Sequence, residues 1–452
     1  MIAILGGGIS GLSIAYTLKK AGKKFILLEA DNEVGGKIKS RKQKGYTFEL
    51  GPNTVLINNP EIKSLLDELN LNQEIIQPDE LAVKKRFILC NGKMEALPSS
   101  PGSLFSSKLI SLRSIFKVLG EPFKKPLDDK LEESLADFTR RRLGNEIYEN
   151  FVYPFVTGIY AGDPEKMTMD YTLKILKEAE QNHGSIIKGM IKTMKVKKAE
   201  NEASNIPKQK IFIFKDGLQR LPHRMAEEMS SEISYNSKVL QIIKLGQGYQ
   251  INYTKEGEEC SVKVDKLIST LPVHHLTNLI TWNSDLTNAL NQIHYVPAII
   301  CHFGYQKNDI TTPEKAFGIL SRKVETAPFL GVLFNSKFFP HTAPADKELI
   351  TVISGGYKQE DFANWTASKI QTTVKQAIND LFQSKNEPEF EHFYQWNQGI
   401  PQYEMGHKKI VAAIEKFELE HNGFHILGNF RDGISVSDCI ANGIKFANSF
   451  NL

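Results

Sequence analysis

Three glycines near the start of the chain have the spacing of a phosphate-binding loop. Gly6, Gly8 and Gly11 follow the apolar residues 2–5, and apolar side chains then recur at helical spacing. In this pattern the first glycine permits a tight turn, the second lets the backbone approach a diphosphate, and the third allows close helix packing. The helix N-terminus offers N–H groups to phosphates. Glu29, which ends the next apolar segment, can accept hydrogen bonds from a ribose hydroxyl. Together these residues predict a site for an adenine dinucleotide.

The end of the chain carries a second element of this kind. Residues 424–427 read as an apolar strand that runs into Gly428 and Asn429, and a new helix is expected to begin near residues 435–438. A helix N-terminus after a short loop can hold an anionic group. Flavoenzymes use such an element for the diphosphate and for the electron-rich edge of a reduced flavin ring. By itself, the pattern fits an ordinary packing unit of strand and helix equally well.

No Ser/His/Asp, Cys/His or metal-binding arrangement stands out in the sequence. The four cysteines are scattered without a CxxC spacing, so we expect buried thiols and no metal site. His274 and His275 follow a Leu-Pro pair at the end of a predicted strand, and we assign them a structural role. These observations favour chemistry carried by a cofactor, with the protein supplying orientation and electrostatics.

Length and composition narrow the class of protein. The chain has 452 residues, which is enough for two or three domains, and 41% of them are hydrophobic. A net charge of +4 is too small to argue for nucleic acid binding. The nucleotide-binding pattern begins at residue 2, which leaves no room for a leader peptide, and no apolar run approaches the length of a membrane span. We therefore expect a cytoplasmic location.

Local patterns also predict individual elements. Residues 60–76 and 104–195 read as mainly helical, and the polar residues 196–210 read as an exposed loop. Asn91-Gly92 between two apolar segments predicts a β-hairpin over residues 84–97. Alternating residues predict a meander of three strands, at 240–245, 249–254 and 261–270.

Five further segments carry distinctive motifs, at residues 140–144, 153–164, 215–222, 330–336 and 400–403. Together with the glycine loop they resemble the flavin amine oxidase superfamily, and within it the oxygen-dependent protoporphyrinogen oxidases. The resemblance covers nearly the whole chain. It implies an α/β fold of three parts: a Rossmann-like FAD-binding domain of the amine oxidase type, a mixed-sheet substrate domain and a helical domain that faces a membrane. The ranges that follow are 1–80, 210–272 and 416–452 for FAD, 81–103 and 273–415 for substrate, and 104–209 for the helical domain.

The resemblance also implies roles for single residues. The residues expected to hold the adenosine diphosphate half of FAD are Gly6, Gly8, Gly11, Glu29, Gly36 and Lys37, with Val239 at the adenine and Asn429 and Val436 nearer the flavin. Lys37 stands where arginine is usual, so the charge is kept and the planar fork is lost. Arg86 is expected to pair with a propionate, and Gly158 to face the reacting methylene carbon as the catalytic position. Phe317, Leu320 and Ile353 are expected to clamp the tetrapyrrole rings.

The activity that the resemblance implies is the oxidation of protoporphyrinogen IX to protoporphyrin IX in haem biosynthesis. Six electrons leave in three rounds, O2 is the acceptor and H2O2 is produced. Three alternatives stay open. Coproporphyrinogen III, with two extra propionates, is a rival substrate. Another flavin amine oxidase or a carotenoid desaturase has the same scaffold, and so do non-enzymatic binders such as the Rab GDP-dissociation inhibitors.

Residues 104–125 mix apolar and basic side chains. Such a segment can lie at an anionic membrane surface, although a helix packed on its own domain with a solvated basic face has the same pattern. The resemblance implies peripheral attachment to the inner face of the cell membrane, with ferrochelatase as a candidate for product hand-off. It also leaves a homodimer open.

Overall fold

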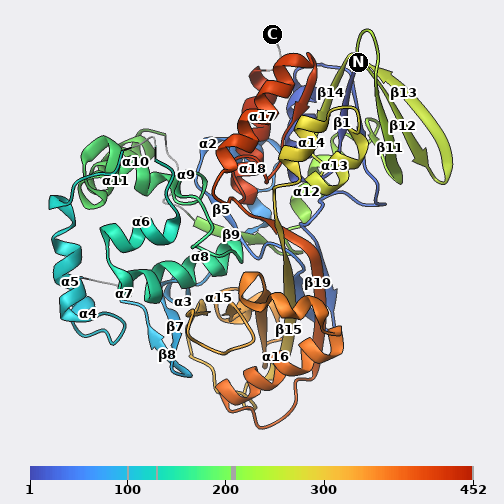
Figure 1. Ribbon diagram of the computed structural model, residues 1–452. Helices are drawn as coiled ribbons and strands as arrows, with labels where there is room; N and C mark the ends of the chain where they lie inside the picture. Colours follow the sequence, from blue (N-terminus) through green and yellow to red (C-terminus); the bar gives the residue numbers. More distant parts are fainter. Residues whose placement is uncertain (99–100, 129–130, 205–209, 450–452) are drawn as a thin grey trace.

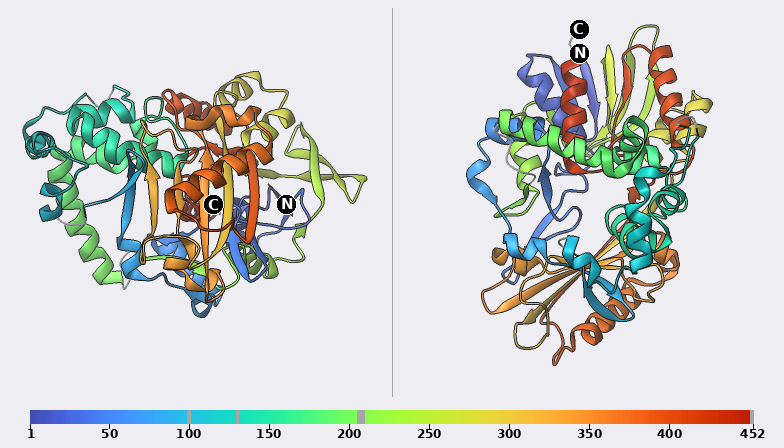
Figure 2. Two further views of the ribbon diagram at one scale, coloured as in Figure 1. Left: turned by 90° about the horizontal axis from the view of Figure 1, so that it is seen from below. Right: turned by 90° about the vertical axis from the view of Figure 1, so that its left-hand side faces the viewer.

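The computed structural model describes residues 1–98, 101–128, 131–204 and 210–449. Figures 1 and 2 show three parts: a parallel sheet with its helices at one end, a larger sheet at the other end, and a group of helices from α4 to α11 that flanks both. The predicted α/β class is confirmed by these sheets.

A five-stranded sheet joins the two ends of the chain. Its order is β10-β2-β1-β14-β20, and every neighbouring pair is parallel. The strands are β1 (Ile2–Leu5), β2 (Phe25–Leu28), β10 (Ile233–Ser234), β14 (Lys266–Ser269) and β20 (Phe424–Ile426). They are short and apolar because helices or strands cover both faces, as is usual for parallel sheets.

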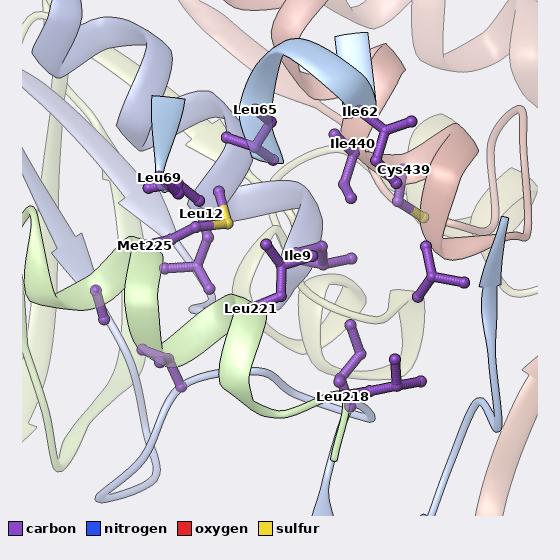
Figure 3. Packing of buried hydrophobic residues seen from close by; sticks show 14 of the residues in the cluster. Ile9, Leu12, Ile62, Leu65, Leu69, Leu218, Leu221, Met225, Cys439 and Ile440 are labelled. Atoms are coloured by element: carbon purple, nitrogen blue, oxygen red, sulfur yellow. The ribbon is translucent and has the colours of Figure 1, made fainter. Parts of the chain in front are cut away.

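Side chains that alternate along β1 enter two different cores. Ile2 and Ile4 pack with α1 (Ile9–Lys20), α2 (Pro60–Glu68), α12 (Arg220–Glu227) and α18 (Val436–Ser449). Figure 3 shows this core, in which Leu12, Leu65, Leu221 and Ile440 converge from the four helices. On the other face Ala3 and Leu5 pack with a second group of elements. That group consists of β11 (Ser237–Lys244), β12 (Tyr249–Lys255), β13 (Glu258–Val264), α13 (Val273–Leu279), α14 (Ser284–Leu290) and α17 (His407–Glu420).

The larger sheet has seven strands in the order β19-β15-β18-β17-β16-β7-β8. They are β7 (Arg86–Cys90), β8 (Lys93–Ala96), β15 (Tyr295–Gln306), β16 (Gly318–Ser321), β17 (Gly331–Leu333), β18 (Lys347–Gly355) and β19 (Phe390–Pro401). Only the β16–β7 pair within it is parallel. One face is covered by α16 (Ala367–Phe382), whose Ile370 and Val374 belong to the same buried core as Ile319 and Val352. Part of the opposite face is covered by Tyr46 and Phe48, which share a buried core with Leu349.

Short elements connect the two sheets. They are β3 (Ser40–Gln43), β4 (Tyr46–Glu49), β5 (Val55–Ile57), η1 (Asn72–Glu74), β6 (Ile75–Ile76), α3 (Glu80–Lys84), β9 (Lys210–Phe214), α15 (Asn335–Phe338), η4 (Pro340–Thr342) and η5 (Tyr357–Asn364). Strand β9 pairs with both β5 and β6.

The flanking helices are held together by a buried ionic cluster. The elements are α4 (Pro101–Phe105), α5 (Leu112–Leu119), η2 (Glu121–Phe123), α6 (Leu135–Arg142), α7 (Asn145–Ile147), η3 (Tyr148–Val152), α8 (Tyr153–Tyr160), α9 (Met169–Thr172), α10 (Lys174–His183) and α11 (Ile186–Ser204). Arg142 is fully buried and forms ion pairs with Glu121 and Glu180. Because an unpaired buried charge is costly, this cluster fixes α6, η2 and α10 relative to one another.

Three local predictions need correction. The loop predicted for 196–210 is helical as far as Ser204, since charged and small residues favour helices as readily as loops; residues 205–209 lie outside the described chain. The third meander strand ends at Val264, and residues 266–269 form β14 instead, because Leu267 and Ile268 are fully buried beside β1. The helix predicted for 60–76 ends at Glu68. The hairpin at 84–97 is confirmed, with Asn91 and Gly92 at φ 53° and 71°.

Candidate active site

The glycine loop has the shape that its sequence predicts. Gly6 has φ +96°, which favours glycine. A Cβ placed on Gly8 would meet no atom within 4 Å, whereas a Cβ on Gly11 would lie 2.0 Å from the carbonyl oxygen of Gly6. The backbone is thus open at Gly8, where a ligand can approach, and closed at Gly11, where α1 packs against the loop.

Glu29 stands at the end of β2, beside this loop. Its Oε2 accepts a hydrogen bond of 2.6 Å from the N–H of Gly7, and its Oε1 accepts one of 2.8 Å from Asp31. Burial raises the pKa of Glu29 above its usual range. The N–H of Ser237 donates to the Glu29 carbonyl at 2.7 Å, which brings the start of β11, and with it Val239, to this end of the sheet. Glu29 therefore contacts the loop directly, and Val239 lies two residues beyond its backbone partner Ser237.

Gly36 and Lys37 approach the loop from the other side. The N–H of Gly35 donates to the Gly7 carbonyl at 2.8 Å, and a Cβ on Gly36 would lie 3.3 Å from Cα of Gly8. Lys37 Nζ donates to the carbonyl oxygens of Gln398, at 2.8 Å, and Gly399. Burial lowers the pKa of Lys37 to about 8. Within the described part of the chain Lys37 has no carboxylate partner, so the cation is available to an anionic ligand.

The C-terminal element meets the same region. A Cβ on Gly443 of α18 would lie 3.0 Å from Cβ of Ser13, so α18 crosses α1 at close range. Before α18, the hydroxyl of buried Tyr403 donates to the Asn429 carbonyl at 2.5 Å and accepts from the N–H of Gly433 at 3.0 Å. These bonds shape the loop between Asn429 and the first residue of the helix, Val436.

The predicted substrate residues form a row across the larger sheet. Leu320 of β16 is in register with Gly331 of β17, which is in register with Ile353 of β18. Register partners share a face, and Leu320 and Ile353 are half-buried there. A Cβ on Gly158 of α8 would lie 2.5 Å from Cδ2 of Leu320. The structure therefore places Gly158 beside Leu320. It also places Gly331 between Leu320 and Ile353 in the sheet.

Arg86 and Phe317 lie at one end of this row. Arg86 is in register with Gly318, and its guanidinium carbon lies 5.0 Å from the centre of the Phe317 ring. Its Nε donates to the Val83 carbonyl at 3.3 Å. Arg86 is exposed and forms no ion pair with any described residue. It can therefore bind a carboxylate by two parallel hydrogen bonds.

The residues present fit a dinucleotide cofactor. The open backbone at Gly8, the N-terminus of α1 and the cation of Lys37 are groups of the kind that bind a diphosphate. Sequence patterns predict no role for Tyr403 or Tyr295, which the structure places next to Asn429 and Lys37 respectively. Both tyrosines are buried in the fold, and their contacts are made with residues distant in the chain, so no local pattern reveals them. No group of His, Cys, Asp and Glu in the described chain could hold a metal ion.

Comparisons with known proteins agree with this geometry. A family described as flavin containing amine oxidoreductase matches residues 9–449. Protoporphyrinogen oxidase 2, chloroplastic/mitochondrial, of Arabidopsis thaliana is 32% identical over 472 residues, which cover 99% of this chain and 92% of the relative. Coproporphyrinogen III oxidase of Bacillus subtilis is 25% identical, with 98% of this chain and 96% of the relative covered. A crystal structure of an Exiguobacterium sp. protein, described provisionally as a protoporphyrinogen oxidase, has the same fold, with a TM-score of 0.82, 20% identity and 99% and 98% coverage.

The family match spans almost the entire chain, and the glycine loop and Lys37 offer backbone N–H groups and a cation of the kind that binds a diphosphate. The chain therefore belongs to the flavin-containing amine oxidoreductases and is an FAD-dependent oxidoreductase.

Proposed function

We propose that the protein oxidises protoporphyrinogen IX to protoporphyrin IX in porphyrin biosynthesis, with O2 as electron acceptor. The observation that carries the proposal is the contact between Gly158 and Leu320, in an apolar row that ends in Arg86, which has no ion pair among the described residues. A porphyrinogen is a large apolar ring with acidic side arms, and this site offers it an apolar face and a cation. The names of the relatives from Arabidopsis thaliana and Bacillus subtilis support the same class of substrate.

Each residue has a distinct task in this proposal. Leu320 and Ile353 pack against the face of the ring, and Arg86 binds a propionate. Gly158 lies in the last turn of α8, where helix carbonyl groups lack partners within the helix. Its carbonyl oxygen can therefore point at the electron-poor carbon that forms as a hydride leaves a bridging methylene. Bound FAD supplies the acceptor for two electrons in each of three rounds. In this proposal the three predicted domains bind the cofactor, bind the substrate and contact the membrane, respectively.

The test uses the purified protein loaded with FAD and supplied with protoporphyrinogen IX in air. We expect porphyrin fluorescence to rise together with H2O2. Arg86→Leu should raise KM about tenfold, since hydrogen bonds to charged groups contribute strongly. Lys84→Leu, a change of an exposed cation on α3, is the matched control and should leave KM unchanged.

Coproporphyrinogen III is assayed in parallel, because the Bacillus subtilis relative is named for it. A larger kcat/KM on coproporphyrinogen III would overturn the choice of substrate but not the reaction class. If the protein oxidises neither porphyrinogen, the reaction itself is wrong, and amines and carotenoids become the substrates to test. If it also stays colourless with added FAD, a non-enzymatic binder is favoured.

We propose in addition that α4, α5 and η2 attach the protein to the surface of an anionic membrane. Exposed apolar side chains gather there: Phe105, Leu112, Phe116, Leu119 and Phe123. Among them Phe116 is 71% and Phe123 88% exposed, which is unusual for side chains of this size. Lys108, Arg113 and Lys117 are exposed beside them. Among the described residues, no helix is long and apolar enough to cross a bilayer. An apolar product could pass from this surface to a partner such as ferrochelatase.

A further inference from the structure

An arginine at the end of β16 connects the substrate sheet to the helix that carries Gly158. Arg322 stands two positions after Leu320, and its side chain is largely buried, at 13% exposure. Its Nη1 donates a hydrogen bond of 3.1 Å to Oδ1 of Asn150. Asn150 lies in η3, which runs directly into α8, the helix of Gly158. This contact therefore joins the strand of Leu320 to the helix of Gly158.

The guanidinium group of Arg322 is held in a fixed orientation. Its Nη2 donates to Oε1 of Glu325 at 2.7 Å and to Oδ1 of Asn91 at 3.3 Å. The Glu325 carboxylate also accepts the N–H groups of Asn91, at 2.8 Å, and Gly92, at 3.2 Å, in the turn between β7 and β8. Because a guanidinium group is planar and its N–H groups are arranged as a rigid fork, the bonds of Nη2 determine where Nη1 points.

The backbone beside Arg322 is held as well. Nζ of Lys358, from η5, donates to the Arg322 carbonyl at 2.9 Å and to the Ser321 hydroxyl at 2.6 Å. The N–H of Ser321 donates to the Leu330 carbonyl at 2.9 Å, which continues the pairing of β16 with the segment before β17. Arg322 is therefore anchored to the sheet through both its backbone and its side chain.

The segment that receives this bond has an uncommon conformation. Residues 148–152 of η3 form a π-helical turn, and such turns are rare and frequent at functional sites. Asn150 is the central residue of η3, and its Nδ2 donates to the Leu109 carbonyl at 2.8 Å. The amide group of Asn150 is therefore bonded on both sides, which keeps its oxygen directed at Arg322.

The other end of α8 is attached to the same sheet. The N–H of Tyr357, two residues after β18, donates to the Ala161 carbonyl at 3.0 Å. A Cβ on Gly356 would lie 2.2 Å from that carbonyl oxygen, so the two chains are in close contact. Helix α8 is thus attached before its first turn through Arg322 and after its last turn through Tyr357. Gly158 lies between the two attachments.

We infer that Arg322 is a positioning residue, which holds α8 on the substrate sheet and so keeps Gly158 in place opposite Leu320. This role rests on the proposed function, in which the Gly158 carbonyl stabilises the carbon that becomes electron-poor as a hydride leaves. An interaction of this kind is strongest in the transition state, so its loss lowers kcat more than it changes KM. Leu320 and Arg86 remain on paired strands of the sheet, so the binding of the ring should change little.

The test compares kcat and KM of the FAD-loaded protein on the porphyrinogen that the wild type oxidises. Arg322→Met keeps an apolar stem and removes the guanidinium group, so kcat should fall about tenfold while KM changes less than about twofold. Asn150→Ala removes the same contact from the helix side and should lower kcat by a similar factor. The double variant should be no slower than Arg322→Met alone, because both changes remove one interaction. The ratio of flavin to protein should stay at the wild-type value, since neither residue belongs to the glycine loop.

A conservative variant and a matched control separate this role from general damage. Asn150→Asp keeps an oxygen that accepts from Arg322 but loses the N–H group that donates to Leu109, so its kcat should stay near that of the wild type. Lys323→Met removes the neighbouring cation. The partner of Lys323 is Glu165, at 3.2 Å, and the two side chains are 48% and 31% exposed, so this ion pair contributes little. Lys323→Met should leave kcat and KM unchanged.

Several results would overturn the role of Arg322 alone. One is an unchanged kcat in Arg322→Met. Another is a kcat in Asn150→Asp as low as in Asn150→Ala, which would assign the effect to the bond with Leu109. A third is a joint loss of kcat, substrate affinity and flavin content, which would mean general damage to the fold. In each of these cases the wild type still oxidises a porphyrinogen. A wild type that oxidises none would instead overturn the proposed function, and the role of Arg322 with it.

Discussion

Glu49 is the last residue of β4, and its carboxyl group is buried against Leu218, which lies just before α12. It is 2% exposed, and it accepts hydrogen bonds from the Ser40 hydroxyl at 2.7 Å and the Leu218 N–H at 2.9 Å. Burial raises its pKa to about 8, whereas a carboxyl group in an unfolded chain ionises near 4.5. Between these values the unfolded chain releases a proton that the folded protein keeps. The contribution of Glu49 to stability is therefore complete below about pH 4.5 and is lost as the pH rises to about 8.

Glu49→Gln removes this titration and should make stability less dependent on pH. The free energy of unfolding of the variant, relative to the wild type, should increase between pH 5 and 8 by at most about 1.4 kcal/mol per pH unit. Urea denaturation at four pH values measures it. Glu80→Gln, an exposed residue of α3, is the control and should follow the wild type. Parallel curves for Glu49→Gln and the wild type would show that Glu49 is ionised in the folded protein.

Gly158 is a residue at which the fold leaves little room beside the proposed substrate. A methyl group there would lie 2.5 Å from Cδ2 of Leu320, so that side chain must move into the space proposed for the ring. Gly158→Ala should lower kcat/KM about tenfold, the usual scale of a modest steric conflict. Adding Leu320→Val, which shortens the opposing side chain, should restore part of the loss. Gly246→Ala, where a methyl group meets nothing within 4 Å, is the control. Equal kcat/KM in Gly158→Ala and the wild type would exclude a role for this contact.

At the scale of elements, the β1–loop–α1 unit depends on one close approach. A Cβ on Gly11 would lie 2.0 Å from the Gly6 carbonyl oxygen, which is backbone and cannot turn aside. Gly11→Ala should therefore displace α1 from the loop and reduce the flavin content of the purified protein at least tenfold, measured as the ratio of flavin to protein absorbance. Gly443→Ala, where the nearest atom is 3.0 Å away, places a milder conflict between α1 and α18 and should retain flavin. Full flavin content in Gly11→Ala would contradict this account of the loop.

The sequence predicts elements that depend on the conformations of neighbouring residues. It does not predict elements that depend on contacts between residues distant in the chain. The glycine loop and the Asn91-Gly92 hairpin depend on the conformations of single residues, and both form as predicted. Strand β14 was missed because only its burial beside β1 separates it from the meander. Lys37 donates hydrogen bonds to Gln398 and Gly399, which lie far from it in the chain. The sequence therefore predicts that a cation stands at this position, but not which residues surround it. The roles of the site residues stay predictions until they are tested.

At the scale of the whole molecule, the chain crosses between the two sheets several times, so each sheet combines strands from distant parts of the chain. Strand β1 from the start of the chain lies next to β14, and β14 lies next to β20 from the end. Strands β7 and β8 leave the N-terminal region to form one edge of the larger sheet. The group of helices from α4 to α11 flanks both sheets, which gives the molecule one side rich in exposed apolar residues.

That side is the one proposed to contact a membrane, and its exposure can be tested directly. The wild type should sediment with vesicles that contain anionic lipid, and less so at high salt, because each basic residue near the surface contributes about 1 kcal/mol. Phe116→Asp should weaken vesicle binding about tenfold, since it replaces an inserted ring by a charge that the surface repels. Leu419→Asp, on α17, alters a side chain that is 86% exposed and lies outside this group of helices. It should bind vesicles as the wild type does. Equal losses in the two variants would mean that exposed apolar area in general causes the binding. If the wild type does not bind vesicles, the membrane proposal is wrong, and a contact between these exposed side chains and another protein is favoured.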